Sequence, residues 1–114
     1  MKIIIAGAGD VGFHLAKLLS NESQDTYVID SNAKKLNYID NHLDVITVKG
    51  DATSLVSLKE AGVQDADLIL AVTESQNTNL TIAALSKKLG VKKTIARISN
   101  TEFLTTKEIN FAEV

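Results

Sequence analysis

Five short apolar runs recur along this chain, and they restrict its fold more than any other feature of the sequence. The runs are KIIIA at 2–6, TYVID at 26–30, VITVK at 45–49, LILAVT at 68–73 and TIARI at 94–98. None of them alternates between apolar and polar residues, which is typical of strands buried on both faces of a parallel sheet. Helical patterns separate the runs, at 11–19, 33–39, 55–61 and 80–89.

The alternation of strand and helix predicts a doubly wound α/β fold of the Rossmann type, with a parallel sheet in the order 3-2-1-4-5. The chain has 114 residues, of which 45% are hydrophobic, so we expect one domain over residues 1–114. The sixth strand of such a sheet is expected to be missing or truncated. The segment NTEFLTTKEINFAEV at the end reads as a helix-like tail that stops on Phe111 and Val114 without a closing element. We therefore interpret the chain as a piece of a longer protein.

Glycines and short polar residues mark the ends of the predicted helices. Gly62 and Gly90 lie just past the third and fourth helical patterns, where a left-handed cap favours glycine. Capping boxes are predicted from the spacing of Thr73 with Gln76 and of Ser99 with Glu102.

The composition excludes several classes of function. The formal charge is -2, and eleven of the twelve cations are scattered lysines, so the chain has no basic patch of the kind that binds nucleic acid. It has no cysteine and only two histidines, so we expect no metal site. No apolar run approaches the ~20 residues of a membrane-spanning helix, and we expect a cytoplasmic domain.

The first apolar run ends in a glycine-rich motif, GxGxxG, formed by Gly7, Gly9 and Gly12. Because the motif follows a strand and opens a helix, the three glycines are expected to permit a tight turn, a close approach to a pyrophosphate and close helix–strand packing, respectively. The alternative is a tight turn without a ligand. The predicted phosphate-binding segment consists of Gly7, Ala8, Gly9, Asp10, Val11 and Gly12.

An acid at the end of the second run completes this fingerprint. Asp30 lies eighteen residues after Gly12, close to the usual ~20, where an acid takes the ribose hydroxyls of a dinucleotide. It would repel a 2′-phosphate, so the sequence favours an adenosine ligand with a free ribose diol over NADP.

The segments GAGDVG, VID, KGDAT, DADLILAVT, NTNL and IARI, in this order and spacing, closely resemble the nucleotide-binding lobe of RCK domains, also called KTN domains. The resemblance covers nearly all of residues 1–114. It implies a lobe that binds NAD(H), or alternatively ADP, ATP or AMP, without chemistry on the nucleotide. It also implies a homo-oligomer, a dimer or larger, on the cytoplasmic side of an integral-membrane potassium-translocating subunit. The family's small C-terminal ligand-sensing domain is absent from this sequence.

Further site residues follow from the resemblance by position. The family's GD motif falls on Gly50 and Asp51, where the acid and Ala52 would lie along the adenine. Thr73 and Glu74 fall where the family lines the pyrophosphate and the second ribose or nicotinamide.

Arg97 is the only arginine and ends the fifth run, at the edge where open α/β sheets bind ligands. Simpler roles remain open for three of these residues. Asp51 could cap a helix, Thr73 could be an N-cap, and Arg97 could form a surface or inter-subunit ion pair.

Two other classes of function compete with a regulatory domain. A dehydrogenase whose catalytic domain is absent would share the glycine motif, but it needs an acid–base residue, and both His14 and His42 are expected to be solvated. A divalent cation could instead bind a carboxylate cluster of Asp10, Asp30 and Asp51.

Asp10 bears on the choice of nucleotide. ATP-gated members of the family carry an arginine at this position, so the acid should repel a triphosphate more than a dinucleotide. The sequence predicts tighter binding of NAD(H) than of ATP.

Overall fold

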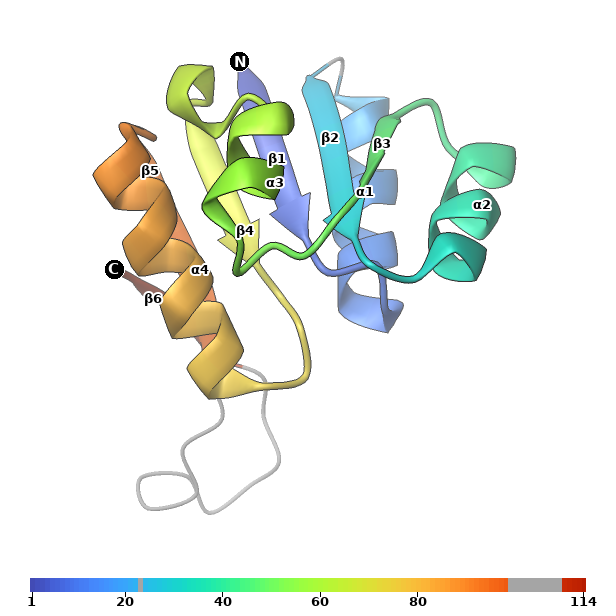
Figure 1. Cartoon of the computed structure of the whole chain (residues 1–114). Helices are drawn as coiled ribbons and strands as arrows, with labels where there is room; N and C mark the ends of the chain where they lie inside the picture. Colours follow the sequence, from blue (N-terminus) through green and yellow to red (C-terminus); the bar gives the residue numbers. More distant parts are fainter. Residues whose placement is uncertain (23, 99–109) are drawn as a thin grey trace.

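The computed structural model describes residues 1–22, 24–98 and 110–114, and within these ranges the strands form one six-stranded sheet in the order β3-β2-β1-β4-β5-β6 (Figure 1). The strands are β1 (Lys2–Ala6), β2 (Asp25–Asp30), β3 (Ile46–Lys49), β4 (Leu68–Ala71), β5 (Lys93–Ile98) and β6 (Asn110–Glu113). The first five strands are parallel, so the predicted fold class and the order 3-2-1-4-5 are confirmed.

The central strand shows why the apolar runs do not alternate. Ile4 and Ala6 of β1 belong to one hydrophobic cluster, whereas Ile3 and Ile5 belong to a second cluster on the other face. All four side chains are at most 2% exposed. Because successive residues of a strand point to opposite faces, a strand covered on both sides must be apolar at every position.

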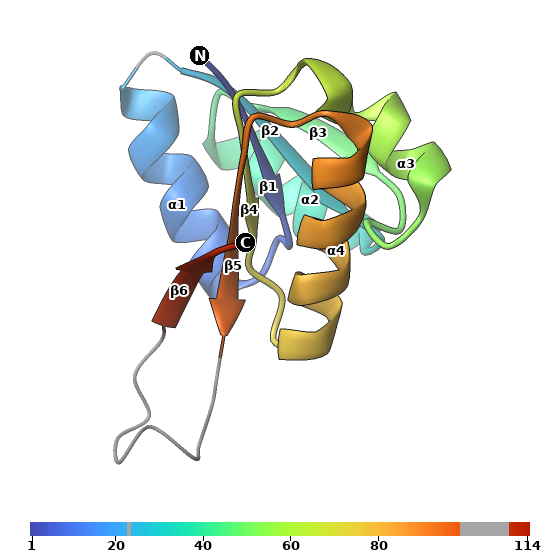
Figure 2. The same cartoon turned by 90° about the vertical axis from the view of Figure 1, so that its left-hand side faces the viewer.

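Helices cover both faces of the sheet (Figure 2). They are α1 (Asp10–Asn21), α2 (Ala33–His42), α3 (Leu55–Glu60), the short 3-10 helix η1 (Val63–Asp65) and α4 (Gln76–Leu89). Ala16 of α1 and Leu36 of α2 are buried in the cluster on one face, and Leu58 of α3 and Ile82 of α4 in the cluster on the other. One domain thus contains two cores separated by the sheet.

The two predicted glycine caps are confirmed. Gly62 follows α3 with φ 77°, and Gly90 ends α4 with φ 108°. Both angles lie in the left-handed region that a residue without a Cβ adopts at little cost. The capping box predicted from Ser99 and Glu102 lies outside the described residues.

The end of the chain differs from the prediction. Residues Asn110–Glu113 form β6, an antiparallel strand beside β5, so the expectation of a tail without a partner was wrong for this segment. Val114 is also held, since its N–H donates to the carbonyl of Thr94 (3.0 Å) and its side chain packs against a core cluster. Without β6, the N–H and C=O groups along one side of β5 would be unpaired, and pairing satisfies them.

Candidate functional site

The glycine motif lies at the point where the strand order reverses. β1 is the central strand, β2 and β3 extend to one side of it, and β4 and β5 extend to the other. In open α/β sheets, ligands bind in the crevice that this reversal leaves at the carboxyl ends of the strands. Two adjoining cavities occupy that crevice.

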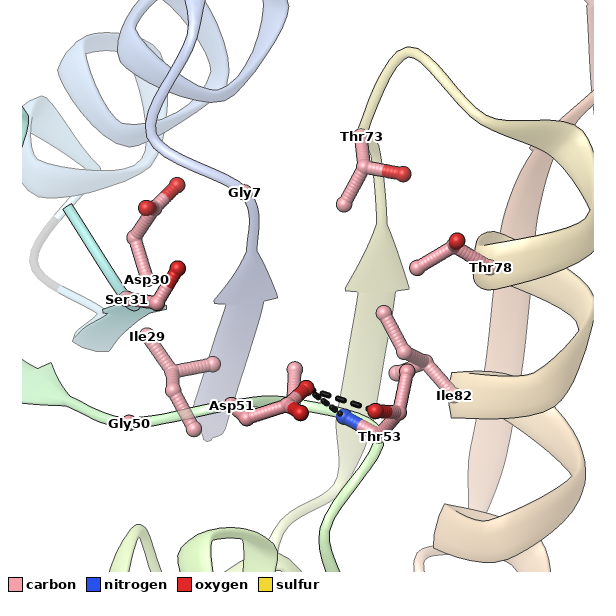
Figure 3. A pocket seen from close by; sticks show the side chains of 11 residues that line it. Gly7, Ile29, Asp30, Ser31, Gly50, Asp51, Thr53, Thr73, Thr78 and Ile82 are labelled. Atoms are coloured by element: carbon pink, nitrogen blue, oxygen red, sulfur yellow. Dashed lines mark hydrogen bonds between the residues drawn. The ribbon is translucent and has the colours of Figure 1, made fainter.

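The larger cavity, which we call the loop cavity, has a volume of about 380 Å³. The predicted residues that line it are Gly7, Ala8, Gly9, Asp10, Val11, Asp30, Thr73, Glu74 and Arg97. The smaller one, the β3-side cavity, has a volume of about 130 Å³ and is lined by Asp51 and Ala52 together with Gly7, Asp30 and Thr73 (Figure 3). The structure therefore brings together every predicted site residue except Gly12, which is buried below the loop.

The three glycines of the motif are required for different reasons. Gly7 has φ 120°, and a Cβ there would lie 3.1 Å from the backbone nitrogen of Thr73. A Cβ on Gly12 would lie only 1.8 Å from the carbonyl oxygen of Gly7, which no rearrangement of a side chain could relieve. A Cβ on Gly9 would meet nothing within 4 Å. A tight turn explains Gly7 and Gly12, but Gly9 faces open space beside the loop.

Helix α1 begins directly at this open space. Its N-cap is Gly9, which provides no side-chain hydrogen bond to the first turn. The first N–H groups of a helix have no partner within the helix, and together with the helix dipole they favour an anion. The loop cavity is therefore suited to a phosphate group at its α1 end.

Asp30 connects β2 to the glycine loop. One oxygen of its carboxylate accepts a hydrogen bond from the N–H of Ala8 (2.8 Å), and the other accepts from the N–H of Asn32 (2.7 Å). A carboxylate has about four acceptor positions, so two remain for a ligand. The sequence placed Asp30 at the site but did not reveal that it also holds the loop.

Asp51 has a different local role from the helix cap that was considered. Its carboxylate accepts hydrogen bonds from the N–H (2.8 Å) and the hydroxyl (2.6 Å) of Thr53, drawn as dashed lines in Figure 3. These bonds favour the charged form and hold the pKa of Asp51 below its ordinary value. The N-cap of α3 is instead Ser54, so the cap interpretation of Asp51 was wrong.

Thr73 is likewise not an N-cap. The side chain of Ser75 caps α4 by accepting from the N–H of Thr78 (3.2 Å), so the capping box predicted from Thr73 and Gln76 was wrong. Thr73 instead donates its hydroxyl to the side-chain oxygen of Asn79 (2.6 Å) and lines both cavities. The spacing identified the turn correctly and the capping residue incorrectly, because two hydroxyl residues precede the helix.

Charges of both signs surround the loop cavity. Asp10, Asp30 and Glu74 contribute carboxylates, while Lys35 and the half-buried Arg97 contribute cations. Within the described ranges no carboxylate pairs with Arg97, which leaves the surface ion-pair alternative without support there. The sequence analysis missed Lys35, although a cation in the first turn of the helix after Asp30 was visible in the sequence.

In the described part of the chain, the residues considered for a divalent-cation site or for a dehydrogenase are not arranged to form either site. Among those residues, no group of three or more carboxylates, histidines or cysteines is arranged to hold a metal ion, so Asp10, Asp30 and Asp51 do not form one cluster. His14 and His42 are exposed and line neither of the two cavities, although His14 lines a further cavity of about 520 Å³ on the outer side of Gly9 and Asp10. Across the same residues, no helix combines the length and apolar character needed to cross a membrane.

A glycine loop at the reversal point of a doubly wound sheet, tied to an acid at the end of β2, defines a domain with the Rossmann-type nucleotide-binding fold. The family model described as the TrkA-N domain matches residues 3–112. The chain belongs to the TrkA-N family, which confirms the resemblance seen in the sequence.

Relatives agree with this assignment. The chain is 40% identical to the Trk system potassium uptake protein TrkA of Vibrio alginolyticus over 97% of its own length and 24% of the relative. It is 38% identical to a TrkA homolog of Archaeoglobus fulgidus over 91% of its length and 23% of that protein. The chain thus spans about a quarter of the length of the curated relatives that it matches.

Solved structures share the fold. The TrkA-N domain of the inner membrane protein ybaL from Escherichia coli has a TM-score of 0.81 at 19% identity, covering 89% of this chain and 75% of that one. The Kef CTD of Shewanella denitrificans, in AMP-bound form, has a TM-score of 0.72 at 26% identity, covering 88% and 60%. A 3-hydroxyacyl-CoA dehydrogenase of Archaeoglobus fulgidus reaches 0.68 at 19% identity, covering 87% and 35%. The fold is therefore shared by a TrkA-N domain of a membrane protein and by a dehydrogenase.

Proposed function

We propose that this chain is the nucleotide-sensing lobe of a regulatory subunit of a Trk- or Ktr-type potassium transporter, and that it binds NAD(H) at the glycine loop. The loop cavity carries this proposal, because the open face of Gly9, the start of α1 and the carboxylate of Asp30 converge on it. The relatives named TrkA support the transport role, and the AMP-bound Kef structure supports an adenine nucleotide.

The proposed ligand extends across both cavities. The adenine lies in the β3-side cavity along Asp51 and Ala52, and Asp30 holds its ribose. The pyrophosphate lies against the N–H groups at the start of α1, as anions do at helix N-termini. The second ribose and nicotinamide then reach Glu74 and Arg97 at the far side of the loop cavity. ADP, ATP or AMP would occupy the adenosine half of the same site.

Regulation requires more than binding. A ligand shifts an equilibrium between two arrangements of a protein only if it binds them with different affinities. We propose that nucleotide binding changes the arrangement of paired lobes in a homo-oligomer, and that this change is transmitted to a potassium-translocating membrane subunit. The lobe then acts in the cytoplasm, at the inner face of the membrane.

A dehydrogenase lobe is the second candidate, favoured by the structural likeness to 3-hydroxyacyl-CoA dehydrogenase. Hydride transfer needs a general acid or base within hydrogen-bond reach of the substrate. Neither histidine of this chain lines the two cavities, and the exposed His14 lies in a separate neighbouring cavity, so neither faces the proposed dinucleotide. We therefore prefer the regulator.

Calorimetry on the purified protein tests the proposal directly. NADH, NAD, AMP, ADP and ATP are titrated separately, after mass spectrometry has identified any nucleotide that co-purifies. We expect saturable binding of NAD(H), which should change potassium flux when the full-length subunit is reconstituted with its membrane partner. If no nucleotide binds at millimolar concentration, or if flux never responds, the proposed function is wrong.

A further inference from the structure

Asn79 is a polar side chain buried at the back of the site. It lies on the first turn of α4 and is only 1% exposed. Its oxygen accepts hydrogen bonds from the N–H (2.9 Å) and the hydroxyl (2.6 Å) of Thr73. Its nitrogen donates to the carbonyl oxygens of Thr73 (3.0 Å) and Arg97 (2.8 Å). A side-chain amide offers two donors and two acceptor positions, so Asn79 is fully satisfied by two residues of the site.

The position of Asn79 follows from the separation of two strands. The parallel pairing between β4 and β5 ends at Ala71 and Ala96. Beyond that pair the chain turns away from β4 into α4, and Thr73 no longer faces a neighbouring strand. The first turn of α4 inserts Asn79 between Thr73 and Arg97, where its amide replaces the missing ladder hydrogen bonds. Buried backbone groups at this point would otherwise lack partners.

The two residues that Asn79 holds differ in reach: Thr73 lines both cavities, whereas Arg97 lines only the loop cavity. Thr73 and Arg97 both line the loop cavity, which faces the part of the ligand beyond the first phosphate. Asn79 makes no hydrogen bond to Asp30 or Asp51 within the described residues; Ala8, Asn32 and Thr53 hold those carboxylates. The two carboxylates of the adenosine side are therefore held without Asn79, and that side shares only Thr73 with it.

We propose that Asn79 is a positioning residue that sets the preference of this site for a dinucleotide over a mononucleotide. It does so by holding Thr73 and Arg97 in one fixed wall that the second half of a dinucleotide must contact. AMP does not reach Arg97, so it gains less from this wall than a dinucleotide does. The inference rests on the proposed function, since it assumes that the two cavities bind nucleotide.

The test compares NADH with AMP in Asn79→Asp, which keeps the size of the side chain and its acceptor oxygens but removes both donors. Asn79→Ser serves as a second, uncharged variant in case the buried carboxylate prevents folding. Leaving the carbonyls of Thr73 and Arg97 unpaired should weaken NADH at least about tenfold in calorimetry. AMP should weaken by less than about threefold, a split that a general loss of stability does not produce.

Two control variants separate positioning from stability. Ser86→Ala changes a second buried polar side chain of α4 whose hydroxyl has no partner within the described residues, and it should leave both affinities unchanged. Val63→Ala destabilises the core at the amino-terminal end of the sheet, where Val63 is fully buried, and should lower the melting temperature without changing the NADH to AMP ratio.

The outcomes are distinguishable. A selective loss of NADH binding in both Asn79 variants supports the inference. An equal loss of both ligands, or no loss, overturns it while the proposed function stands. If the unmodified protein binds neither ligand, the proposed function fails and the inference fails with it.

Discussion

The two sides of the ligand site are built in different ways. On the β3 side, the carboxylates of Asp30 and Asp51 each accept a hydrogen bond from a backbone N–H two residues further along the chain, that of Asn32 or Thr53. Within the described residues, only Asp30 of the two has a distant partner as well, the N–H of Ala8. On the β4–β5 side, Thr73 and Arg97 are joined by Asn79, which lies eighteen residues before Arg97. Figure 3 shows Asp30 and Thr73 on opposite sides of Gly7.

The two sides thus differ in what holds their side chains in place, which is either a short turn or the assembled tertiary structure. A turn in which an Asp side chain bonds the backbone two residues further on depends mainly on the local sequence. A bridge between two strands exists only after the sheet and α4 have assembled. The hydrogen bonds of Asp30 to Asn32 and of Asp51 to Thr53 should therefore tolerate changes elsewhere in the core. The hydrogen bonds of Asn79 should respond to any change that moves α4.

The largest effect is expected from a substitution in the glycine loop, because this loop borders both sides of the ligand site. Gly12→Ala places a methyl group against the carbonyl oxygen of Gly7, and because this is backbone the loop and α1 must separate. We expect a loss of about 3 kcal/mol in the free energy of unfolding, at the upper end of overpacking penalties, measured by urea denaturation. Gly9→Ala is the matched control, because its methyl group meets open space. Equal stability of the two variants would contradict this account of the loop.

The next effect is confined to the β3 side. Asp30→Ala removes the proposed ribose anchor, so NADH and AMP should both weaken at least tenfold while the far-UV spectrum stays native. The N–H of Ala8 also loses its partner, which should lower stability by about 1–3 kcal/mol. Asp25→Ala, at the exposed start of the same strand, is the control. Unchanged affinity, or a loss limited to NADH, would show that Asp30 does not hold the ribose.

A smaller effect is expected from the negative charge of Asp10 in the glycine loop. Asp10 is exposed at the start of α1 and lines the loop cavity. Two like charges near 4 Å cost about 1 kcal/mol in water and up to about 4 kcal/mol at the effective dielectric of a protein surface. Asp10→Arg should therefore improve ATP binding more than NADH binding, and added salt should reduce the gain. If both ligands improve equally, Asp10 does not select between them.

The smallest expected effect is an acid sensitivity of the β3 side. The folded-state pKa of Asp51 is lowered by its hydrogen bonds to Thr53, so the unfolded chain binds a proton before the folded chain does. The resulting stabilisation is present above the ordinary value of 3.8 and is lost as the pH falls below it toward the lowered pKa. Asp51→Asn should flatten the dependence of stability on pH in this range, as followed by urea denaturation. An unchanged slope would mean that the hydrogen bonds contribute nothing to stability.

Most of the site could be predicted because parallel strands align their carboxyl ends. Gly7 follows β1, Asp30 ends β2, Asp51 follows β3 and Thr73 follows β4, so the strand order alone gathers them. Asn79 could not be found in this way. It lies just before the helical pattern predicted over 80–89, where a polar residue is expected to be solvent-exposed unless its burial is known.

The sequence by itself determined the class of fold, the order of the parallel strands and the loop between β1 and α1, because periodicity and glycine geometry are local properties. Only the tertiary structure decided that β6 returns beside β5, that Ser75 rather than Thr73 caps α4, and that Asn79 bridges Thr73 and Arg97. For each of these three features, the local sequence was compatible with two alternative structures. The choice between them depended on which buried N–H and C=O groups were left without partners once the sheet had formed.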